Sequence, residues 1–307
     1  MPAFNSEIRD IQALPLAELM SEALKAKRIY RGAKFSLCSI INAKSGHCSE
    51  DCRFCVQSGR YKTDTPLYPL KSVQEIVTAA QEAKRIGSQR FSIVTSGRGM
   101  PANELAQVAE TIKTIRAEVD IEVCASLGIQ TREDFELLKQ AGLSRYHHNI
   151  ETSREFFPKV VTTHTFSDRI ATIYAAMEAG LEVCAGGIFG LGETEDDRIS
   201  MALTLKECSV VSVPINILIP LPGTPLADAP PLSISAILRA IALFRLIMKG
   251  GAIRLAAGRE TILKEFLSAA LLAGADGMMI GGYLTQKGRM PEEDHQLVKE
   301  IVEIWTA

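Results

Sequence analysis

The sequence has neither an excess of charge of one sign nor a long uninterrupted hydrophobic run. Its 34 lysines and arginines nearly balance 36 aspartates and glutamates, so charge alone predicts no binding to nucleic acid or to anionic membranes. The most apolar stretch, residues 266–283, is broken by Gly274 and Asp276, which argues against a transmembrane helix. Residues 1–10 lack the basic-then-apolar order of a secretory signal. We therefore expect a cytoplasmic protein with no membrane or nucleic-acid partner.

The sequence also has no Pro- or Ser-rich linker and no low-complexity tract. A hydrophobic content of 47% together with 23% charged residues excludes a disordered or collagen-like chain. We therefore expect residues 1–307 to form a single domain. Within it, residues 1–33 are predicted to be a helical preface, and residues 284–307 a C-terminal tail that ends in a helix.

Helical and strand patterns alternate along the chain. Amphipathic helical patterns end at glycines and pass into short apolar runs. Three helix starts have capping-box spacing: Ser72 with Glu75, Thr131 with Asp134, and Thr165 with Asp168. The eight predicted strands are residues 35–41, 90–96, 121–127, 145–150, 182–189, 214–219, 252–256 and 277–281. This α/β pattern predicts a (β/α)8 TIM-type barrel with an N-terminal helical extension, and a doubly wound sheet is the competing fold.

Strand alternation places polar and sulfur-containing side chains inside the predicted barrel. The positions with inward parity include Cys38, Arg90, Ser92, Glu122, Cys124, His147, Asn149, Glu182, Cys184, Asn216 and Arg254. Closed barrels are usually filled by branched aliphatic side chains. We therefore expect a ligand to occupy this interior.

The cysteines are odd in number, seven in all, and in a reducing compartment they are better explained as ligands, redox groups or core residues than as disulfides. Three of them, Cys48, Cys52 and Cys55, form a C-x3-C-x2-C cluster after the first predicted strand. Three thiolates hold three irons of a [4Fe-4S] cluster and leave the fourth iron open. An open iron can chelate the methionine end of S-adenosylmethionine (SAM) and pass an electron to its sulfonium.

A structural zinc site is the alternative for this cysteine cluster. Such a site uses four ligands, usually in paired C-x2-C units. His47 abuts Cys48 too closely to complete the set, and no matching cysteine pair follows. The spacing therefore favours the iron–sulfur interpretation.

Further blocks follow the cysteine loop in a characteristic order. They are residues 57–63, 146–153, 186–194, 213–216, 223–226 and 254–260. With the loop, they make the chain resemble the biotin synthase family of the radical SAM superfamily over nearly its full length. The resemblance implies a barrel that inserts sulfur into dethiobiotin to give biotin. It also implies a [4Fe-4S] cluster with SAM, an auxiliary iron–sulfur cluster as sulfur donor, an electron donor of flavodoxin or ferredoxin type, and a homodimer.

The resemblance also assigns residues to ligands. Cys48, Cys52 and Cys55 correspond to the ligands of the radical-generating cluster. Positions near SAM are Phe54, Asn149, Glu151, Arg169, Gly186, Gly187 and Ile188. Asn149 and Asn216 correspond to contacts with the ureido ring of dethiobiotin, whose N–H and C=O groups an amide can satisfy. Two positions depart from the family, because Glu151 replaces an aspartate and His147 an asparagine.

The auxiliary site departs from the family more strongly. The resemblance implies a two-iron cluster held by three cysteines and one arginine, and Cys124, Cys184 and Arg254 match three of these four ligands. Ser92 stands in place of the remaining cysteine, and serine is a poor ligand for iron–sulfur clusters. Cys38 has inward parity on the adjacent strand. We hypothesise that Cys38, Cys124 and Cys184 hold the sulfur-donating cluster beside Arg254, in a triangle suited to a larger cluster.

Two other functions remain open from the residues. A paralogue would keep the radical chemistry on another substrate without sulfur insertion, and a non-catalytic iron–sulfur sensor or zinc module would cleave no SAM. Outside the candidate sites, Cys208 is expected to pack or to lie at the surface, and Trp305 is expected to pack or to contact another subunit. His164, His295 and the helix start 291–295 are expected to be solvated.

Overall fold

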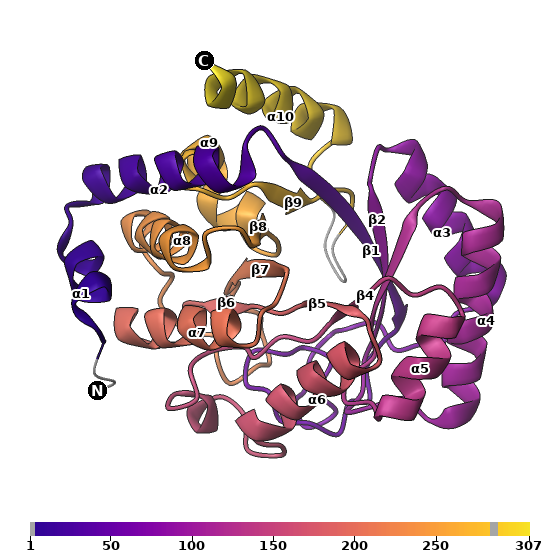
Figure 1. Cartoon of the computed structure of the whole chain (residues 1–307). Coiled ribbons are helices and arrows are strands. Elements are labelled where there is room, and N and C mark those ends of the chain that lie inside the picture. The colour runs from indigo at the N-terminus through magenta and orange to yellow at the C-terminus, as the bar shows by residue number, and fades with distance from the viewer. Residues whose placement is uncertain (1–3, 283–287) are drawn as a thin grey trace.

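The computed structural model describes residues 4–282 and 288–307, which form a closed barrel of parallel strands surrounded by helices (Figure 1). The strands are β1 (Ser36–Lys44), β2 (Arg90–Thr95), β3 (Glu122–Ser126), β4 (Arg145–His147), β5 (Glu182–Cys184), β6 (Gly187–Phe189), β7 (Ser212–Ile217), β8 (Ala252–Leu255) and β9 (Gly277–Met279). The α-helices are α1 (Ser6–Ala13), α2 (Leu16–Arg31), α3 (Val73–Arg85), α4 (Ala102–Glu118), α5 (Arg132–Gln140), α6 (Phe166–Glu178), α7 (Glu195–Glu207), α8 (Ile234–Met248), α9 (Leu267–Leu272) and α10 (Pro291–Thr306). Shorter helical turns are η1 (Phe157–Lys159), η2 (Arg259–Leu263) and η3 (Lys264–Phe266). The predicted α/β class and TIM-type barrel are confirmed.

One predicted strand, residues 182–189, is divided in the structure. β5 pairs with β4, β6 pairs with β7, and a contact between Cys184 and Ser212 joins β5 to β7 and closes the barrel. A Cβ at Gly186, between the two halves, would lie 1.9 Å from the carbonyl oxygen of Pro214. The backbones approach so closely that only glycine fits. β5 and β6 together therefore occupy one of eight strand positions.

The strands stack inward-facing side chains in layers along the barrel. Alternate residues of a strand face the same side, so the first residues of the strands form one layer, and residues two positions later form the next. The first layer contains Ser36, Arg90, Glu122, Arg145 and Glu182, and the second contains Cys38, Ser92, Cys124, His147, Cys184 and Arg254. Strand stagger sets Cys38 beside Arg90 and Cys124 beside Arg145. The interior thiols thus lie one pleat repeat, roughly 6.6 Å, from the amino end of the barrel.

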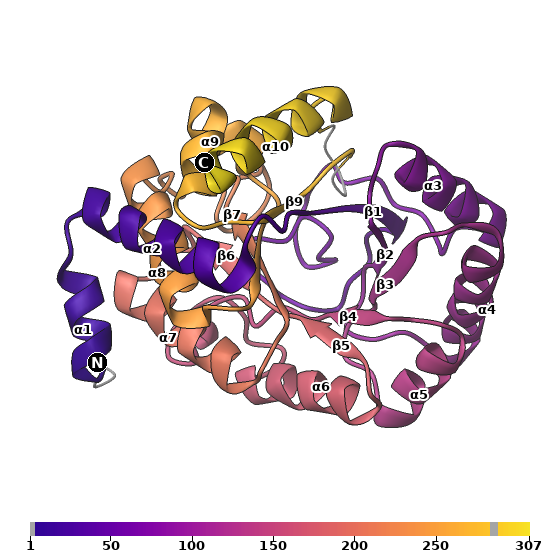
Figure 2. The same cartoon turned by 45° about the horizontal axis from the view of Figure 1, so that its top comes forward.

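The two ends of the chain pack together on the outside of the barrel. α2 packs against α8, and α10 lies above them in Figures 1 and 2. The indole of Trp305 stacks on Phe35, and the ammonium of Lys27 lies 2.7 Å from the centroid of the indole ring. Trp305 therefore packs, as expected. The helix predicted for the tail is α10, and residues 1–3 and 284–287 of the predicted preface and tail lie outside the described residues.

The expectation of a solvated start for α10 is wrong for Asp294. This carboxylate is fully buried and accepts hydrogen bonds of 3.0 and 2.6 Å from the guanidinium of Arg259. A buried charge needs a partner of opposite sign, and Arg259 supplies it from η2, far away in sequence. Among residues 4–282 and 288–307, no helix combines the length and apolarity needed to cross a membrane.

The three predicted capping boxes are confirmed, and one of them supports the site described below. At the start of α6, Thr165 Oγ1 accepts a hydrogen bond from Asp168 N–H, and the Asp168 carboxylate accepts one from Thr165 N–H. Thr165→Ala should lower the free energy of unfolding by about 1 kcal/mol. Thr114→Ala, inside α4, removes only a bond to the backbone of Glu110 and should be neutral or slightly stabilising. Urea unfolding of the two variants checks this, and equal effects would contradict it.

Candidate active site

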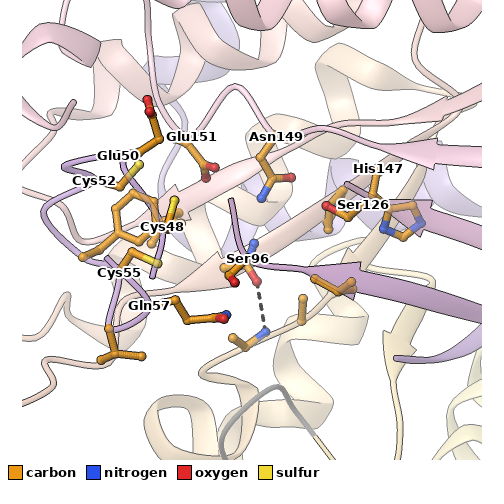
Figure 3. A pocket seen from close by; sticks show the side chains of 18 of the residues that line it. Cys48, Glu50, Cys52, Cys55, Gln57, Ser96, Ser126, His147, Asn149 and Glu151 are labelled. Carbon is orange, nitrogen blue, oxygen red and sulfur yellow. Dashed lines mark hydrogen bonds between the residues drawn. The ribbon is translucent and has the colours of Figure 1, made fainter. Parts of the chain in front are cut away.

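A cavity of about 460 Å³ lies at the carboxyl end of the barrel strands. Residues at the ends of strands, such as Val94, Ser126 and Asn216, line one side of it, and the cysteine loop of residues 48–57 lines the other. Figure 3 shows the loop facing Asn149 and Glu151 across this cavity. The loops at the carboxyl end of TIM barrels carry the catalytic groups. The cavity is therefore the candidate active site.

The structure brings Cys48, Cys52 and Cys55 together, and Figure 3 shows their sulfur atoms on one side of the cavity. Backbone hydrogen bonds fix the loop, since Cys48 N–H donates to Gln57 C=O at 3.1 Å and Gly59 N–H donates to Cys48 C=O at 2.7 Å. Although the three thiols share one side of the cavity, neither they nor any other three His, Cys, Asp or Glu side chains among the described residues lie close enough together to hold a single metal ion. The loop geometry is thus set by its own backbone.

The chemistry of these thiols fits an iron–sulfur cluster. Burial raises the pKa of Cys55 to about 11 and also raises the pKa of Cys52. Thiols of this kind stay protonated unless a cation compensates for burial, and a coordinated metal deprotonates them outright. No fourth cysteine appears among the described residues that line the cavity. Three thiolates suit a [4Fe-4S] cluster with one open corner.

A buried hydrogen-bonded chain connects the cysteine loop to helix α6. His164 Nδ1 lies 2.5 Å from Glu50 Oε2, and Arg169 Nε donates to His164 Nε2 at 3.0 Å. Because Nε2 accepts, Nδ1 carries the proton and donates to the Glu50 carboxylate. Burial and the Arg169 charge lower the pKa of His164, against the effect of Glu50. These hydrogen bonds hold the cysteine loop and Arg169 in one fixed arrangement.

The expectation that His164 is solvated is therefore wrong, and sequence reasoning missed Glu50 altogether. His164 is 7% exposed and Glu50 is 6% exposed. Their ring and carboxylate meet across 114 positions of sequence, so no local pattern reveals the pair. The only sequence signal is the Glu50-Asp51 dipeptide inside the cysteine loop, since carboxylates there need partners once the loop is buried.

Glu151 presents a carboxylate without a full set of partners to this cavity. It is 7% exposed, and its Oε2 atom has no hydrogen-bond partner among the described residues. Arg169 Nη2 lies 3.8 Å from Oε1. Burial raises the pKa of Glu151, and the charge of Arg169 opposes this. Its φ of 66° is in the left-handed region, which costs a non-glycine residue of order 1 kcal/mol. An unpartnered buried oxygen here fits a ligand that donates hydrogen bonds, such as the hydroxyl groups of a ribose.

Of the other positions assigned to SAM, three line the cavity and two do not. Phe54, Arg169 and Ile188 line the cavity, whereas Gly186 and Gly187 are not among its described lining residues. A Cβ at Gly187 would lie 2.3 Å from the carbonyl oxygen of Glu151. These two glycines therefore serve the close packing of neighbouring backbones.

Both asparagines assigned to dethiobiotin line the cavity, and both also bind backbone groups. Asn149 Oδ1 accepts a hydrogen bond from Gly186 N–H at 3.2 Å. Asn216 Nδ2 donates to Gly187 C=O at 3.1 Å, and its Oδ1 accepts from Ala257 N–H at 3.2 Å. The backbone contacts fix the orientation of each amide, and an amide oxygen or NH2 group retains capacity for one further bond.

A second group of thiols lies deeper in the barrel. Cys38, Cys124 and Cys184 are 5%, 1% and 1% exposed, and Arg254, 5% exposed, lies among them. Although burial opposes it, the three thiolates raise the pKa of Arg254. Burial raises the pKa of Cys124 to about 11, while nearby arginines lower it. The sequence prediction that these four residues meet inside the barrel agrees with this placement.

Ser92 and Arg254 show that this interior is polar but incompletely satisfied. Ser92 Oγ and Arg254 Nη1 are buried and have no hydrogen-bond partner among the described residues. Ser92 pairs with Cys124 across the sheet, whereas Cys38 pairs with Arg90, two positions closer to the amino end. Orphaned buried polar atoms point to a missing group, and thiols with an arginine suit an anionic iron–sulfur cluster. Cys208, by contrast, is buried at the end of α7 beside Tyr174 and packs as expected.

His148 gives the apoprotein a pH-dependent stability. It is 3% exposed, and burial followed by the charge of Arg169 lowers its pKa well below 6.5. Below pH 6.5 the unfolded chain therefore binds a proton that the folded chain refuses, and stability falls as pH falls. Each pH unit costs up to about 1.4 kcal/mol for this group.

His148→Leu should therefore show a shallower loss of unfolding free energy between pH 6.5 and 5.5. Urea unfolding of the cluster-free parent and variant measures this difference. Above pH 7.5 the two proteins should show the same slope, and equal slopes below pH 6.5 would refute the role of His148.

Comparisons with known proteins identify the family of the chain. A family profile described as Radical SAM superfamily matches residues 44–205, and one described as Biotin and Thiamin Synthesis associated domain matches residues 214–301. A biotin synthase of Pelotomaculum thermopropionicum is 48% identical over 286 residues, which cover 93% of this chain and 89% of that protein. A biotin synthase of Thermotoga petrophila is 44% identical over 299 residues, covering 97% and 99%.

Solved structures agree on the fold. Methylornithine synthase superposes with a TM-score of 0.81 at 20% identity, covering 99% of this chain and 93% of that one. The hydrogenase maturase HydG of Carboxydothermus hydrogenoformans gives a TM-score of 0.75 at 22% identity, covering 97% and 76%. These identities are low, so both likenesses show the barrel alone. The family profiles and the near full-length relatives carry the assignment, and the chain belongs to the biotin synthase family of the radical SAM superfamily.

Proposed function

We propose that this chain inserts sulfur into dethiobiotin to form biotin, with its sulfur-donating auxiliary cluster held by Cys38, Cys124 and Cys184. The observation that carries the proposal is the presence of two separate thiol groups, one in the loop above the cavity and one in the barrel beneath it. The cavity between them is the space in which a substrate would meet both. Sulfur insertion needs this arrangement, whereas SAM cleavage alone needs only the loop.

When bound, the loop cluster supplies the electron that splits SAM, and the auxiliary cluster supplies the sulfide. The chain contributes positions and charges. Cys48, Cys52 and Cys55 would hold the loop cluster, and the unpartnered Oε2 of Glu151 would accept hydrogen bonds from the ribose hydroxyls of SAM. Arg169 is held by His164 at 3.0 Å and lies 3.8 Å from the Glu151 carboxylate. Its charge would compensate for that carboxylate and for the carboxylate of bound SAM in a buried site.

Asn149 and Asn216 orient the substrate. Each amide is fixed by backbone hydrogen bonds, so it meets the ureido ring in one orientation without first losing side-chain freedom. The apolar lining by Phe54 and Ile188 excludes water from the carbons that lose hydrogen, which protects a reactive radical from side reactions.

Cys38 distinguishes this auxiliary site from that of the family, whereas Arg254 matches the family's arginine. Cys38 stands one pleat repeat below Ser92 and on the adjacent strand, so the triangle of thiols differs from the one that a cysteine at position 92 would form. We propose a cluster larger than the two-iron one, with Arg254 as a ligand or as a counter-charge next to it.

We propose a homodimer that works in the cytoplasm and receives electrons from a low-potential flavodoxin- or ferredoxin-type donor. All seven cysteines are free, which suits a reducing compartment. The segment matched by each family profile supplies strands to one barrel, which supports the proposal that residues 1–307 form a single domain.

Anaerobic turnover with dethiobiotin and SAM tests the function. The reconstituted protein, given a chemical reductant, should form biotin together with 5'-deoxyadenosine and methionine. Formation of deoxyadenosine without biotin would instead support the paralogue that acts on another substrate. Absence of SAM cleavage under the same conditions would refute the enzyme assignment.

A further inference from the structure

A second cavity opens at the amino end of the barrel, opposite the active site. Its volume is about 620 Å³. Its walls include the first residues of six strands, namely Ser36, Arg90, Glu122, Arg145, Glu182 and Ala252. In TIM barrels this end usually serves stability rather than chemistry. The charged and polar side chains that line this cavity do not fit a purely stabilising role.

The charge of this amino-end cavity favours an anion. Four arginines line it, Arg31, Arg90, Arg145 and Arg254, against two glutamates. Arg145 binds Glu182 at 2.7 Å, and Arg90 lies 3.5 Å from the same carboxylate, so one glutamate is shared by two cations. The other glutamate, Glu122, is paired with Arg116 at 3.7 Å outside the cavity. Arg31 is paired with Asp276 at 2.5 Å, so the surplus positive charge of the cavity comes from Arg90, Arg145 and Arg254.

Buried polar atoms in its inner wall lack protein partners. Arg254 is 5% exposed, its Nε donates to Ser212 Oγ at 2.8 Å, and its Nη1 has no hydrogen-bond partner among the described residues. Ser36 Oγ, also buried, has no partner there either. Two unsatisfied donors at the end of a cationic cavity are the groups that a small anion would satisfy.

The same wall touches the interior thiols. Cys38 pairs across the sheet with Arg90, and Cys124 pairs with Arg145. Arg254, which also lines the cavity, lies on β8 in the same layer of inward-facing side chains as these thiols. The positive charge of the cavity thus extends to the thiol layer.

The thiol layer separates two cavities with different linings. Residues two positions beyond the layer, such as Ile40, Ser126 and Asn149, line the upper cavity, and residues two positions before it line the amino-end cavity. The upper cavity is where SAM and the substrate would bind. A sulfur species that approached the thiols from above would have to pass bound SAM and substrate, whereas neither of these would occupy the amino-end cavity.

We propose that the amino-end cavity binds a small inorganic anion and is the route by which hydrosulfide reaches Cys38, Cys124 and Cys184. The choice of hydrosulfide rests on the proposed function, because a centre that gives up sulfide must be resupplied. At neutral pH a substantial share of dissolved sulfide is the hydrosulfide anion, and this share rises as the pH rises. Arg90, Arg145 and Arg254 are its binding residues, and the cavity excludes cations.

Labelled sulfide tests the route on the full-length protein. The Cys48→Ala/Cys52→Ala/Cys55→Ala variant, which lacks the loop ligands, is loaded with iron and sulfide and incubated anaerobically with sulfur-34 sulfide without SAM. The rate at which label enters its acid-labile sulfide is measured by mass spectrometry. Arg90→Gln/Arg145→Gln in this background should slow the exchange about tenfold, and Arg132→Gln, which loses only an exposed pair with Glu136, should not.

A second arm needs no arginine variant. In the intact protein with both groups loaded, S-adenosylhomocysteine and dethiobiotin fill the upper cavity without turnover. Label should still enter the auxiliary pool at an unchanged rate, and 0.5 M chloride should slow it several-fold by competition and screening. Exchange that stops when the upper cavity is filled, or that ignores both chloride and the arginine changes, would overturn the proposal.

A third arm separates this inference from the proposed function. In the cluster-free chain, iodoacetate (anionic) and iodoacetamide (neutral) compete for the thiols, and their ratio at Cys124 and Cys184 is mapped by peptide mass spectrometry against Cys208. An anionic preference about tenfold above that at Cys208, lost in Arg90→Gln/Arg145→Gln, supports the anion cavity even if no auxiliary cluster forms. A ratio equal to that at Cys208 refutes the cavity, whatever the protein catalyses.

Discussion

Cys38→Ser is expected to abolish the auxiliary cluster while leaving SAM cleavage at the loop intact. The loss of even an outer partner of a metal ligand costs roughly 10–100-fold in affinity or activity, so loss of the ligand itself should lower biotin formation by about 100-fold or more. The deoxyadenosine burst should remain, because Cys48, Cys52 and Cys55 line a separate cavity. Iron and acid-labile sulfide counts, Mössbauer spectra and product analysis measure the three effects.

Two variants control this experiment. Cys208→Ser removes another buried cysteine, at the end of α7 and outside the barrel interior, and should leave iron and sulfide content unchanged. Ser92→Cys in the Cys38→Ser background places a thiol directly beside Cys124, where the family carries one, and should restore an auxiliary cluster of the smaller, two-iron kind. An unchanged auxiliary signal in Cys38→Ser would remove Cys38 from the site.

The residues that alternation could place were predicted well from the sequence. Cys124, Cys184 and Arg254 follow from inward parity on strands whose outward residues are apolar, and parity depends only on the two-residue repeat of a strand. Cys38 follows in the same way. The barrel itself follows from repeated helix–glycine–strand units, since each unit is local.

Contacts between distant segments could not be predicted in this way. The break between β5 and β6 depends on the carbonyl of Pro214, which approaches Gly186 from the neighbouring strand. The pairing of His164 with Glu50 and the burial of Asp294 against Arg259 depend on how loops and helices meet in space. For His164 and Asp294, a polar group that looked solvated is buried because a distant partner of matching chemistry meets it.

The arginines at the amino end of the barrel could be predicted only in part from the sequence. Parity places Arg90 inward, but it does not show that Arg145 and Arg254 face the same cavity. Stagger between strands sets Arg90 beside Cys38 and Arg145 beside Cys124. Stagger belongs to the closed barrel as a whole, so the cationic wall next to the thiols appears only with the structure.

Glu151→Gln is expected to weaken SAM binding about 10- to 100-fold. Hydrogen bonds to a charged group contribute about 1.5–3 kcal/mol, and each 1.4 kcal/mol is about tenfold in affinity. Glutamine keeps the size of the side chain and its left-handed backbone, so the 66° φ costs the same in both proteins. The variant therefore isolates the negative charge of the oxygen that lacks a protein partner. Anaerobic calorimetry with the unreduced, cluster-loaded protein measures the dissociation constant without turnover.

The pH dependence of binding separates a direct role of Glu151 from a structural one. Burial raises the pKa of this carboxyl, so its protonation begins at a higher pH than that of an exposed glutamate. SAM affinity in the parent should fall as pH falls through this raised pKa, because the acceptor oxygens are lost as the carboxylate is neutralised. Glu151→Gln should lack that loss, whereas Glu155→Gln, at an exposed position near Ser200, should behave as the parent. A parent-like pH profile in Glu151→Gln would mean that Glu151 only supports the fold of the loop, and that another group receives the ribose.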